Sequence, residues 1–234
     1  MKDLPQVISV YMSRTTGIKE HCARCLRTER WNGNVVLMIV DAAFTSIGLN
    51  YFTAVVPRVM KFKEESVDCG KVKDLESLSN LPEEKMQGIW RNRRSWQVAK
   101  AIASYLYELG KREELDERRA FRLWAANSQL EGWREDPIGK ISGVGITTFQ
   151  YLRMMGGIDT AMPDKIVRKV VKQMLDEAET DMPTEGDIDL VRTIERLSEL
   201  SGYRPIELCW MTWLIQPEGK MIRMDKYQKL LDKI

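Results

Sequence analysis

The spacing of apolar side chains is the feature that most constrains this chain. They recur every three or four residues, as on the buried face of an amphipathic α-helix. The spacing predicts helices over residues 97–109, 164–178, 188–197 and 205–215, and a helix that begins near Ala120 and ends near Asn127. Alternating apolar runs joined by Asn-Gly or Asp-Gly, which would indicate a β-hairpin, do not occur. We therefore expect an all-α fold.

Length and composition limit the class of protein. The chain has 234 residues and 27.1 kDa, of which 44% are hydrophobic and 30% charged, so it can bury a core and is not a disordered or low-complexity chain. The net charge of 36 − 34 = +2 does not mark a nucleic-acid binder, so any such surface must be local. Four cysteines and the lack of an apolar leader predict reduced thiols and a cytoplasmic location, or a nucleoid or nuclear one with DNA.

One apolar stretch raises the question of a membrane span. Residues 35–56 are long enough to cross a bilayer, but they include Asp41 and several other polar residues. A charge near the middle of a lone span is costly, and no comparable second stretch follows. We therefore expect a buried helix pair here and no membrane contact.

A glycine turn between two predicted helices is the most informative local motif. Residues 140–148 read Lys-Ile-Ser-Gly-Val-Gly-Ile-Thr-Thr, which predicts a short helix closing at Ile141 and a second opening at Ile146. Gly143 and Gly145 permit a tight reversal whose backbone N–H groups, with the next helix N-terminus, suit a phosphate. A plain helix connection with glycine caps is the alternative. A dinucleotide fingerprint and a Walker loop are excluded, because a helix precedes the glycines and neither the third glycine nor Gly-Lys-Ser/Thr is present.

A second motif follows at a fixed distance. Sixteen residues beyond Thr148, Asp164 follows Pro163 and opens the next predicted helix. The pair of motifs, Ile-Ser-Gly-Val-Gly-x-x-Thr and Pro-Asp-x-x-Val-x-x-Val, resembles the signature of the helix–hairpin–helix base-excision DNA glycosylases, the superfamily of endonuclease III. The resemblance covers roughly residues 35–175, with its specific part in the two motifs.

The resemblance implies that Asp164 is the catalytic residue of a DNA N-glycosylase. Cleavage of an N-glycosidic bond builds positive charge on the sugar, and a fixed carboxylate near C1′ stabilises that charge and orients or deprotonates the attacking water. The positive end of the helix dipole favours the ionised carboxylate. The other interpretation is that Asp164 only caps its helix.

One departure from the family pattern concerns strand cleavage. Bifunctional members carry a Schiff-base lysine where this chain has Thr147, and threonine cannot form an imine. The resemblance therefore implies a monofunctional glycosylase that releases the base and leaves an abasic site. A displaced lysine, Lys140 or Lys165, has no support in the spacing.

A second departure concerns metal. The endonuclease-III-type iron–sulfur run needs four closely spaced cysteines near the C-terminus, where this chain has Cys209 alone. Cys22 and Cys25 form a lone Cys-x-x-Cys pair that would need both Cys69 and Cys209 to complete a four-ligand site. We expect structural thiols and no metal.

Positive charge gathers locally, as DNA contact would require. Residues 140–172 contain six Lys or Arg and two Asp, 6 − 2 = +4, and Arg91, Arg93 and Arg94 form a second cluster. By resemblance, the Gly143–Gly145 amides, with Thr148 nearby, bind a phosphate through a monovalent cation. The expected DNA-binding residues are Lys140, Gly143, Val144, Gly145, Thr148, Arg93, Arg94, Lys165 and Arg168.

A base inside a duplex must be flipped out and stacked on aromatic rings before it can be excised. Helical spacing alone accounts for Trp210 and Trp213 as core residues, and the sequence does not select the ring that faces a base. The available rings are Trp31, Phe44, Tyr51, Trp90, Trp96, Trp133, Tyr203, Trp210 and Trp213.

The resemblance implies two helical subdomains. Residues 33–157 would form a six-helix barrel ending in the helix–hairpin–helix, and residues 1–32 would join 158–234 as the second subdomain, with Asp164 at the floor of the groove between them. The expected function is hydrolysis of the base–sugar bond of a damaged or mispaired base in double-stranded DNA, by a monomer. The alternative is a non-catalytic helix–hairpin–helix DNA-binding module.

Overall fold

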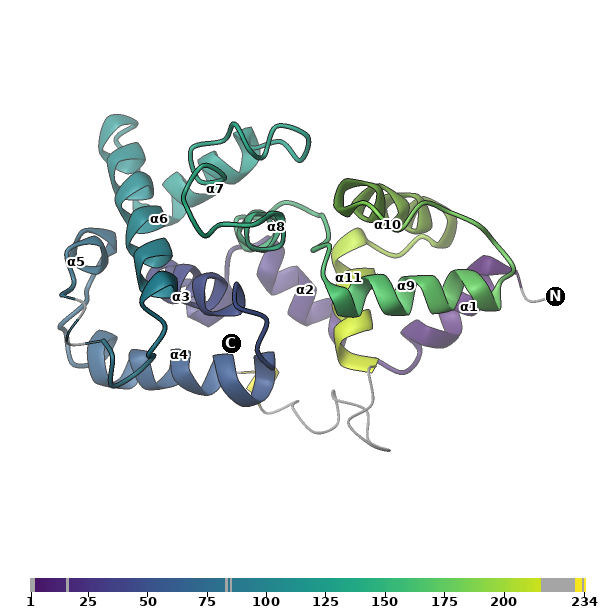
Figure 1. The fold of residues 1–234 in the computed structure, drawn as a ribbon, viewed down its shortest axis with the longest axis horizontal. Helices are drawn as coiled ribbons and strands as arrows, with labels where there is room; N and C mark the ends of the chain where they lie inside the picture. The colour runs from purple at the N-terminus through teal and green to yellow at the C-terminus, as the bar shows by residue number, and fades with distance from the viewer. Residues whose placement is uncertain (1–2, 16, 83, 85, 216–229, 233) are drawn as a thin grey trace.

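The computed structural model describes residues 3–15, 17–82, 84, 86–215, 230–232 and 234. Within these residues the regular secondary structure is entirely helical, which confirms the expected all-α class (Figure 1). The α-helices are α1 (Leu4–Met12), α2 (Ile18–Leu26), α3 (Val35–Thr45), α4 (Val56–Phe62), α5 (Leu75–Ser79), α6 (Arg93–Arg112), α7 (Glu117–Asn127), α8 (Ile146–Met155), α9 (Lys165–Glu177), α10 (Asp187–Ser201) and α11 (Pro205–Ile215). Three short segments of other helical type are η1 (Arg30–Gly33), η2 (Tyr51–Val55) and η3 (Lys63–Val67).

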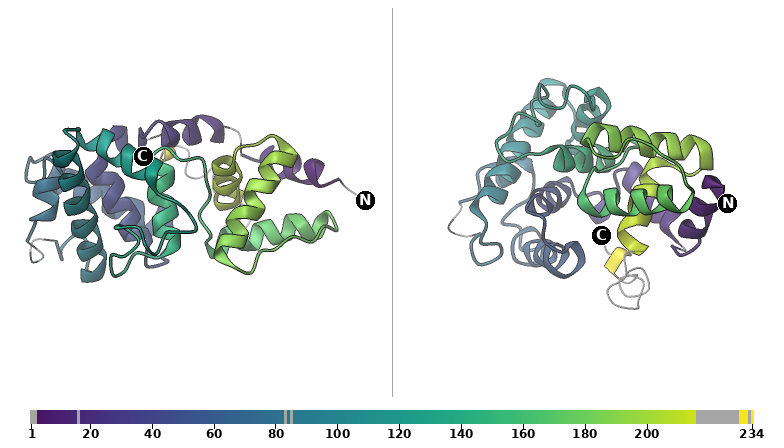
Figure 2. Two further views of the ribbon diagram at one scale, coloured as in Figure 1. Left: turned by 90° about the horizontal axis from the view of Figure 1, so that it is seen from above. Right: turned by 45° about the vertical axis from the view of Figure 1, so that its right-hand side comes forward.

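The helices pack in two sets that lie toward opposite ends of the long axis (Figures 1 and 2). In one set α1, α9 and α11 pack on one another and α10 packs on α1 and α11, so the beginning of the chain lies against its later part. In the other set α6 packs on α3, α5 and α7, and α3 and α7 both contact α8. Helix α2 contacts both α8 and α11, which joins the sets.

One hydrophobic cluster runs through both sets of helices. It includes Val7 of α1, Ile39 of α3, Phe149 of α8 and Met211 of α11, all essentially inaccessible to solvent. The predicted division into subdomains at residues 33–157 therefore stays a prediction, because packing is continuous across it.

The apolar stretch 35–56 does not form one helix. α3 buries its side chains from Val35 to Phe44 and ends at Thr45, and the chain turns before η2 begins at Tyr51. None of the described helices has the length and apolar character that crossing a membrane requires.

The segment before the glycine turn differs from the prediction. Instead of a short helix closing at Ile141, residues 131–143 form successive turns. The Asp136 carboxylate organises them by accepting hydrogen bonds from the Trp124 indole (3.0 Å) and the Ile138 backbone N–H (2.8 Å). A Cβ at Gly139 would lie 1.6 Å from the Trp133 carbonyl oxygen, so the loop closes on itself too tightly for a helix. Gly and Pro residues close to an Asp that accepts local hydrogen bonds are typical of a loop, and the spacing of apolar residues did not reveal this.

Candidate functional site

Asp164 is the residue immediately before α9. Its backbone is extended, and its Oδ1 atom accepts hydrogen bonds from the N–H groups of Ile166 (2.7 Å) and Val167 (2.8 Å). This is the N-cap geometry expected of Asp, so the interpretation of Asp164 as a helix cap accounts for the contacts of Oδ1. The other oxygen, Oδ2, is buried and has no hydrogen-bond partner among the described residues. A buried carboxylate oxygen without a partner is costly for the fold.

Burial controls the charge of this carboxylate. Desolvation raises the pKa of Asp164 to about 6, while the Val167 and Ile166 amides, the Trp213 indole and Arg168 all act to lower it. The group is therefore an anion at neutral pH, as the sequence predicted, but with an affinity for protons well above that of an exposed Asp.

The glycine turn leads directly into α8, which begins at Ile146 as predicted. Gly143 has φ +105°, a conformation that L side chains rarely adopt, and a Cβ there would lie 2.7 Å from Val98 Cγ2 and 2.9 Å from Arg94 Nε. Gly145 has an ordinary backbone conformation, is exposed, and has no atom within 4 Å of a Cβ position. The first glycine therefore serves close packing on α6, and the second leaves the backbone open to a ligand.

Two contacts bring the separate sequence motifs together. Thr147 donates a hydrogen bond from Oγ1 to the Pro163 carbonyl oxygen (3.5 Å), next to Asp164. Arg94 lies against Gly143 at the other side of the turn. The glycine turn thus lies between the basic N-terminus of α6 and the carboxylate at the N-terminus of α9, and this triple arrangement is the candidate site.

The two glycines should respond differently to the same small change. Gly143→Ala is expected to lower the free energy of unfolding by about 1–3 kcal/mol, because the added methyl group meets α6 and the backbone is strained. Gly145→Ala is expected to change it by less than about 0.5 kcal/mol, because nothing surrounds that position. Urea denaturation of both variants measures the difference, and equal losses would contradict the assigned roles.

The other predicted DNA-binding residues lie in unlike environments. Arg93, Arg94 and Lys165 are exposed, and Lys140 is exposed while forming an ion pair with Glu135 (Nζ–Oε2 3.3 Å). Val144 and Thr148 are buried, so their side chains face the protein, and only their backbone groups remain available to a ligand.

Arg168 is committed to a structural role. Its guanidinium donates to the carbonyl oxygens of Thr184 and Glu185 and forms an ion pair with Asp187 (2.6 Å). These contacts tie α9 to the segment that leads into α10. Unlike Lys165, therefore, this residue does not offer a free positive charge to DNA.

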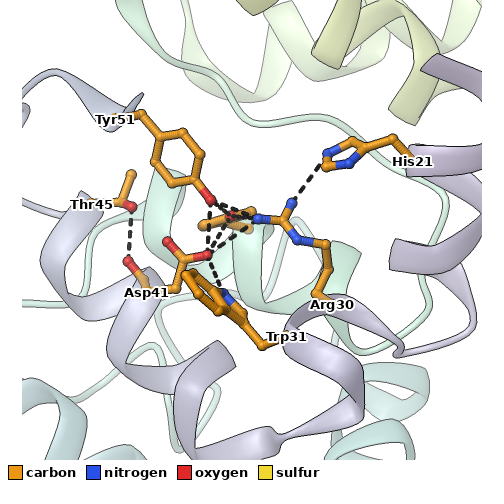
Figure 3. Close-up of polar contacts among 7 residues, drawn as sticks. His21, Arg30, Trp31, Asp41, Thr45 and Tyr51 are labelled. Atoms are coloured by element: carbon orange, nitrogen blue, oxygen red, sulfur yellow. Dashed lines mark hydrogen bonds and ion pairs between the residues drawn. The ribbon is translucent and has the colours of Figure 1, made fainter. Parts of the chain in front are cut away.

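A buried polar cluster lies behind the site and was missed by sequence reasoning (Figure 3). Arg30 and Asp41 have fully buried side chains and form an ion pair (Nη2–Oδ2 3.3 Å). The same Asp41 oxygen accepts hydrogen bonds from the Trp31 indole (2.9 Å) and from the hydroxyl groups of Tyr51 (2.9 Å) and Tyr151 (3.0 Å). Tyr151 belongs to α8, so the cluster fixes the helix that follows the glycine turn. The available signal was Asp41 itself, a charge inside an apolar helix.

The cluster extends toward the second set of helices. Arg30 lies over the Trp210 ring of α11 at 5.1 Å from its centroid, and its Nη1 atom is 3.3 Å from His21 Nε2 on α2. Burial, with help from Arg30, lowers the pKa of His21 well below its usual value, so the imidazole is neutral at pH 7. The buried positive charge of Arg30 is therefore stabilised by a carboxylate, by hydroxyl groups and by the face of an indole ring.

The positions of the four cysteines bear on the question of a metal site. Cys22, Cys25 and Cys209 are buried, and Cys69 is exposed. Among the residues that the structure describes, no group of three or more His, Cys, Asp or Glu side chains is placed to hold a metal ion. Cys209 instead accepts a hydrogen bond from the Met162 backbone N–H (3.4 Å), which ties α11 to the segment before Asp164.

A pocket of about 710 Å³ adjoins the basic cluster. Its lining includes Leu49, Arg58, Trp90, Arg91 and Asn92, so it opens beside the N-terminus of α6, and Asp164 does not line it. Comparison of the chain with models of protein families, with curated proteins and with solved structures gives no match.

Proposed function

We propose that the protein is a DNA glycosylase that hydrolyses the N-glycosidic bond of a damaged or mispaired base flipped from double-stranded DNA. The observation that carries the proposal is the contact between Thr147, in the first turn of the helix after the glycine turn, and Pro163, the residue before Asp164, whose Oδ2 has no hydrogen-bond partner. A phosphate held at the turn would bring its deoxyribose toward that carboxylate. The resemblance of the two motifs to helix–hairpin–helix glycosylases supports the same conclusion.

Each part of the site has a distinct task in this reaction. The amides around Gly145, together with the N-terminus of α8, bind the phosphate, and the open space at Gly145 admits the hydrated monovalent cation that the family resemblance implies. Arg93, Arg94 and Lys165 neutralise neighbouring phosphates. Asp164 Oδ2 stabilises positive charge at C1′ and orients the attacking water.

The grouping of the helices supports the expected arrangement in two subdomains. Helices α3 to α8 pack among themselves, and α1, α9, α10 and α11 pack among themselves, with Asp164 in the connection that passes from one set to the other. This agrees with a two-subdomain division near residues 33 and 157. Of the two helices that the expected motif requires around the turn, the described residues contain the second, α8, because residues 131–143 form turns.

A panel of duplexes tests the proposal. The protein is incubated with duplexes that contain uracil, hypoxanthine, 8-oxoguanine, alkylated purines or T·G mismatches, and alkali then reveals abasic sites. Release of one class of base by the wild type, with duplex binding but no release by Asp164→Asn, supports the enzyme. Binding without release across the panel would overturn it in favour of a non-catalytic DNA-binding module.

The same reactions test for lyase activity. Because Thr147 occupies the lysine position and donates to Pro163, we expect no covalent adduct when borohydride is added during base release. Strand breaks should require alkali. A borohydride-trapped adduct would contradict the monofunctional assignment, and Lys140→Gln and Lys165→Gln would then identify the amine.

Gly145→Ala offers a test of the phosphate site that does not depend on catalysis. A methyl group at this exposed position would obstruct a phosphate without disturbing the protein, so we expect weaker duplex binding with an unchanged melting temperature. Fluorescence anisotropy with a labelled duplex at several salt concentrations measures the affinity. A partly exposed site on another helix, Ser198→Ala on α10, serves as the control, and equal affinity of both variants would contradict the assignment.

A further inference from the structure

The pocket beside the N-terminus of α6 is built from separate segments of the chain. Ile47 and Leu49 follow α3, Arg58 belongs to α4, and residues 87–92 lead into α6. Its volume of about 710 Å³ lies within the range of about 300–1,000 Å³ that is usual for small-molecule sites. Asp164 does not line it, so the pocket and the candidate catalytic residue can be tested separately.

A hydrogen bond between segments and a ring stack hold the walls of this pocket in place. The Lys61 ammonium group of α4 donates to the Gly88 carbonyl oxygen (3.0 Å), which ties α4 to the segment before α6. The Trp90 ring stacks on Phe44 of α3, with centroids 4.4 Å apart and an interplanar angle of 7°. The Trp90 carbonyl oxygen also accepts a hydrogen bond from the Trp96 indole of α6 (2.9 Å). Because its walls are fixed by the protein itself, the pocket can bind a ligand with little ordering of the chain.

The charged side chains that line the pocket are both positive. Arg58 and Arg91 are exposed, and the described lining includes no Asp or Glu. Neither guanidinium has a hydrogen bond, an ion pair or an aromatic partner among the described residues. Two guanidinium groups without a counter-charge favour an anion, and the planar fork of arginine suits a phosphate.

A second pocket shows arginines in a structural role. Arg119 and Arg122 of α7 line a cavity of about 410 Å³. Arg119 forms an ion pair with Asp116 (3.4 Å), and Arg122 donates to the Leu26 carbonyl oxygen (3.1 Å). These two guanidinium groups are therefore engaged within the protein, whereas those of the first pocket are not.

The rest of the first pocket suits a nucleobase. Leu49 is 47% exposed and lines the pocket with the partly buried Ile47, so apolar surface is open to a ligand. Gln87, also exposed, carries a carboxamide that can donate and accept hydrogen bonds, as the edge of adenine requires. The lining thus supplies groups for a phosphate, for the face of a base and for its edge.

We propose that this pocket binds a nucleotide, with its phosphate on Arg58 and Arg91 and its base against Ile47 and Leu49. A free nucleotide and a nucleotide within a DNA strand carry the same phosphate and base, so the experiment must distinguish these two sources. The inference goes beyond the proposed glycosylase function and does not depend on it, because Asp164 takes no part in the pocket.

Calorimetric titration of the full chain with deoxyadenosine monophosphate tests the pocket. We expect saturable binding with a Kd below about 1 mM, weakened about tenfold by Arg58→Gln and by Arg91→Gln, because each variant loses a charge-assisted hydrogen bond. Both side chains are exposed, so the melting temperature should not change. Arg119→Gln alters an exposed arginine of the other pocket, and this matched control should bind as the wild type does.

Leu49→Ala separates a nucleotide site from a site for any anion. The smaller side chain should weaken binding of deoxyadenosine monophosphate about fivefold, because the base covers less apolar surface, and should leave binding of inorganic phosphate unchanged. Deoxyadenosine, which lacks the phosphate, should bind more weakly than the nucleotide. Equal effects of Leu49→Ala on the nucleotide and on inorganic phosphate would contradict the proposal.

A competition experiment identifies the source of the nucleotide. A single-stranded oligodeoxyadenylate that displaces the mononucleotide assigns the pocket to a nucleotide within a DNA strand. An oligonucleotide that fails to displace it assigns the pocket to a free nucleotide.

Gly145→Ala distinguishes the pocket from the phosphate site expected at the glycine turn. This variant should bind the mononucleotide as the wild type does, because Gly145 does not line the pocket. Absence of saturable binding up to about 10 mM, or its loss in Gly145→Ala rather than in the arginine variants, would overturn the proposal. Base release without mononucleotide binding would refute the nucleotide pocket alone, and mononucleotide binding without base release would refute the glycosylase alone.

Discussion

Asp164→Asn is expected to lower the rate of base release by about two to four orders of magnitude while making the protein more stable at pH 7. The loss of rate follows because the amide carries no negative charge to stabilise the developing sugar cation. The gain in stability follows because the native state no longer holds an ionised group at a position that desolvates it. Asn caps helices as well as Asp does, so α9 keeps its N-terminus.

The direction of the stability effect comes from the pKa of Asp164. Burial raises it from 3.8 to about 6, so the folded protein binds a proton more readily than the unfolded chain between these values. The stability that this proton provides is complete below pH 4 and is lost as the pH rises through 6. At pH 7 the ionised carboxylate costs at most about 3 kcal/mol, and a smaller value is expected because the side chain is partly exposed.

Two measurements check this prediction. The melting temperature of Asp164→Asn should exceed that of the wild type at pH 7, by about 2–4 °C for each kcal/mol gained, and the two should converge near pH 4. The release rate of the wild type should fall tenfold for each pH unit below about 6, where Asp164 becomes protonated. Asp164→Ser, which also caps a helix, controls for the new amide group. A rate that stays constant down to pH 4.5 would show that this carboxylate is not the essential base.

Asp41→Asn is expected to have the largest effect on folding. The substitution leaves the Arg30 guanidinium fully buried without a counter-charge, which costs about 3–5 kcal/mol of unfolding free energy. Replacing both partners, Arg30→Met with Asp41→Leu, should cost less than the sum of the single changes, because the double variant buries no unpaired charge. Urea denaturation of the wild type, Arg30→Met, Asp41→Leu and the double variant measures the four free energies of unfolding that this cycle needs.

An exposed ion pair provides the comparison for this cycle. Lys63 and Asp68 are in contact at 2.7 Å, with 40% and 48% of their side chains exposed, so Asp68→Asn should change stability by less than about 1 kcal/mol. A loss for Asp41→Asn no larger than that of Asp68→Asn would mean that the buried cluster does not support the fold. Because Tyr151 is bound to Asp41, a folded Asp41 variant should also show altered base release through displacement of α8.

The spacing of apolar residues was sufficient to predict helices that bury one face. It placed the helix over 205–215 at its observed bounds and the helix over 164–178 within one residue of each end of α9, and it placed the end of α7 at Asn127. The predicted helix over 97–109 was too short, since α6 extends from Arg93 to Arg112 and contains Gly110, whose absent side chain lets α6 lie close to Ala120 of α7. Close packing of α6 on α7 therefore outweighs the low helix propensity of glycine.

The contacts that assemble the site could not be predicted, because each depends on residues far apart in sequence. Tyr151 meets Asp41 across 110 positions, and Cys209 binds Met162 across 47. The two motifs marked Asp164 and the glycine turn, but not the buried tyrosines that fix α8. Local sequence patterns predict helices and turns. Contacts between helices that are distant in sequence are defined only by the completed fold.

The packing of α1 on α9, α10 and α11 also has a consequence for synthesis. A nascent chain leaves the ribosome N-terminus first, so α1 and α2 emerge long before the helices that cover them. Residues of α3 to α8 find one another earlier, because their partners lie nearby along the chain. The Tyr11 hydroxyl of α1, which binds Glu177 of α9 at 2.5 Å, therefore meets its partner only after α9 has been made.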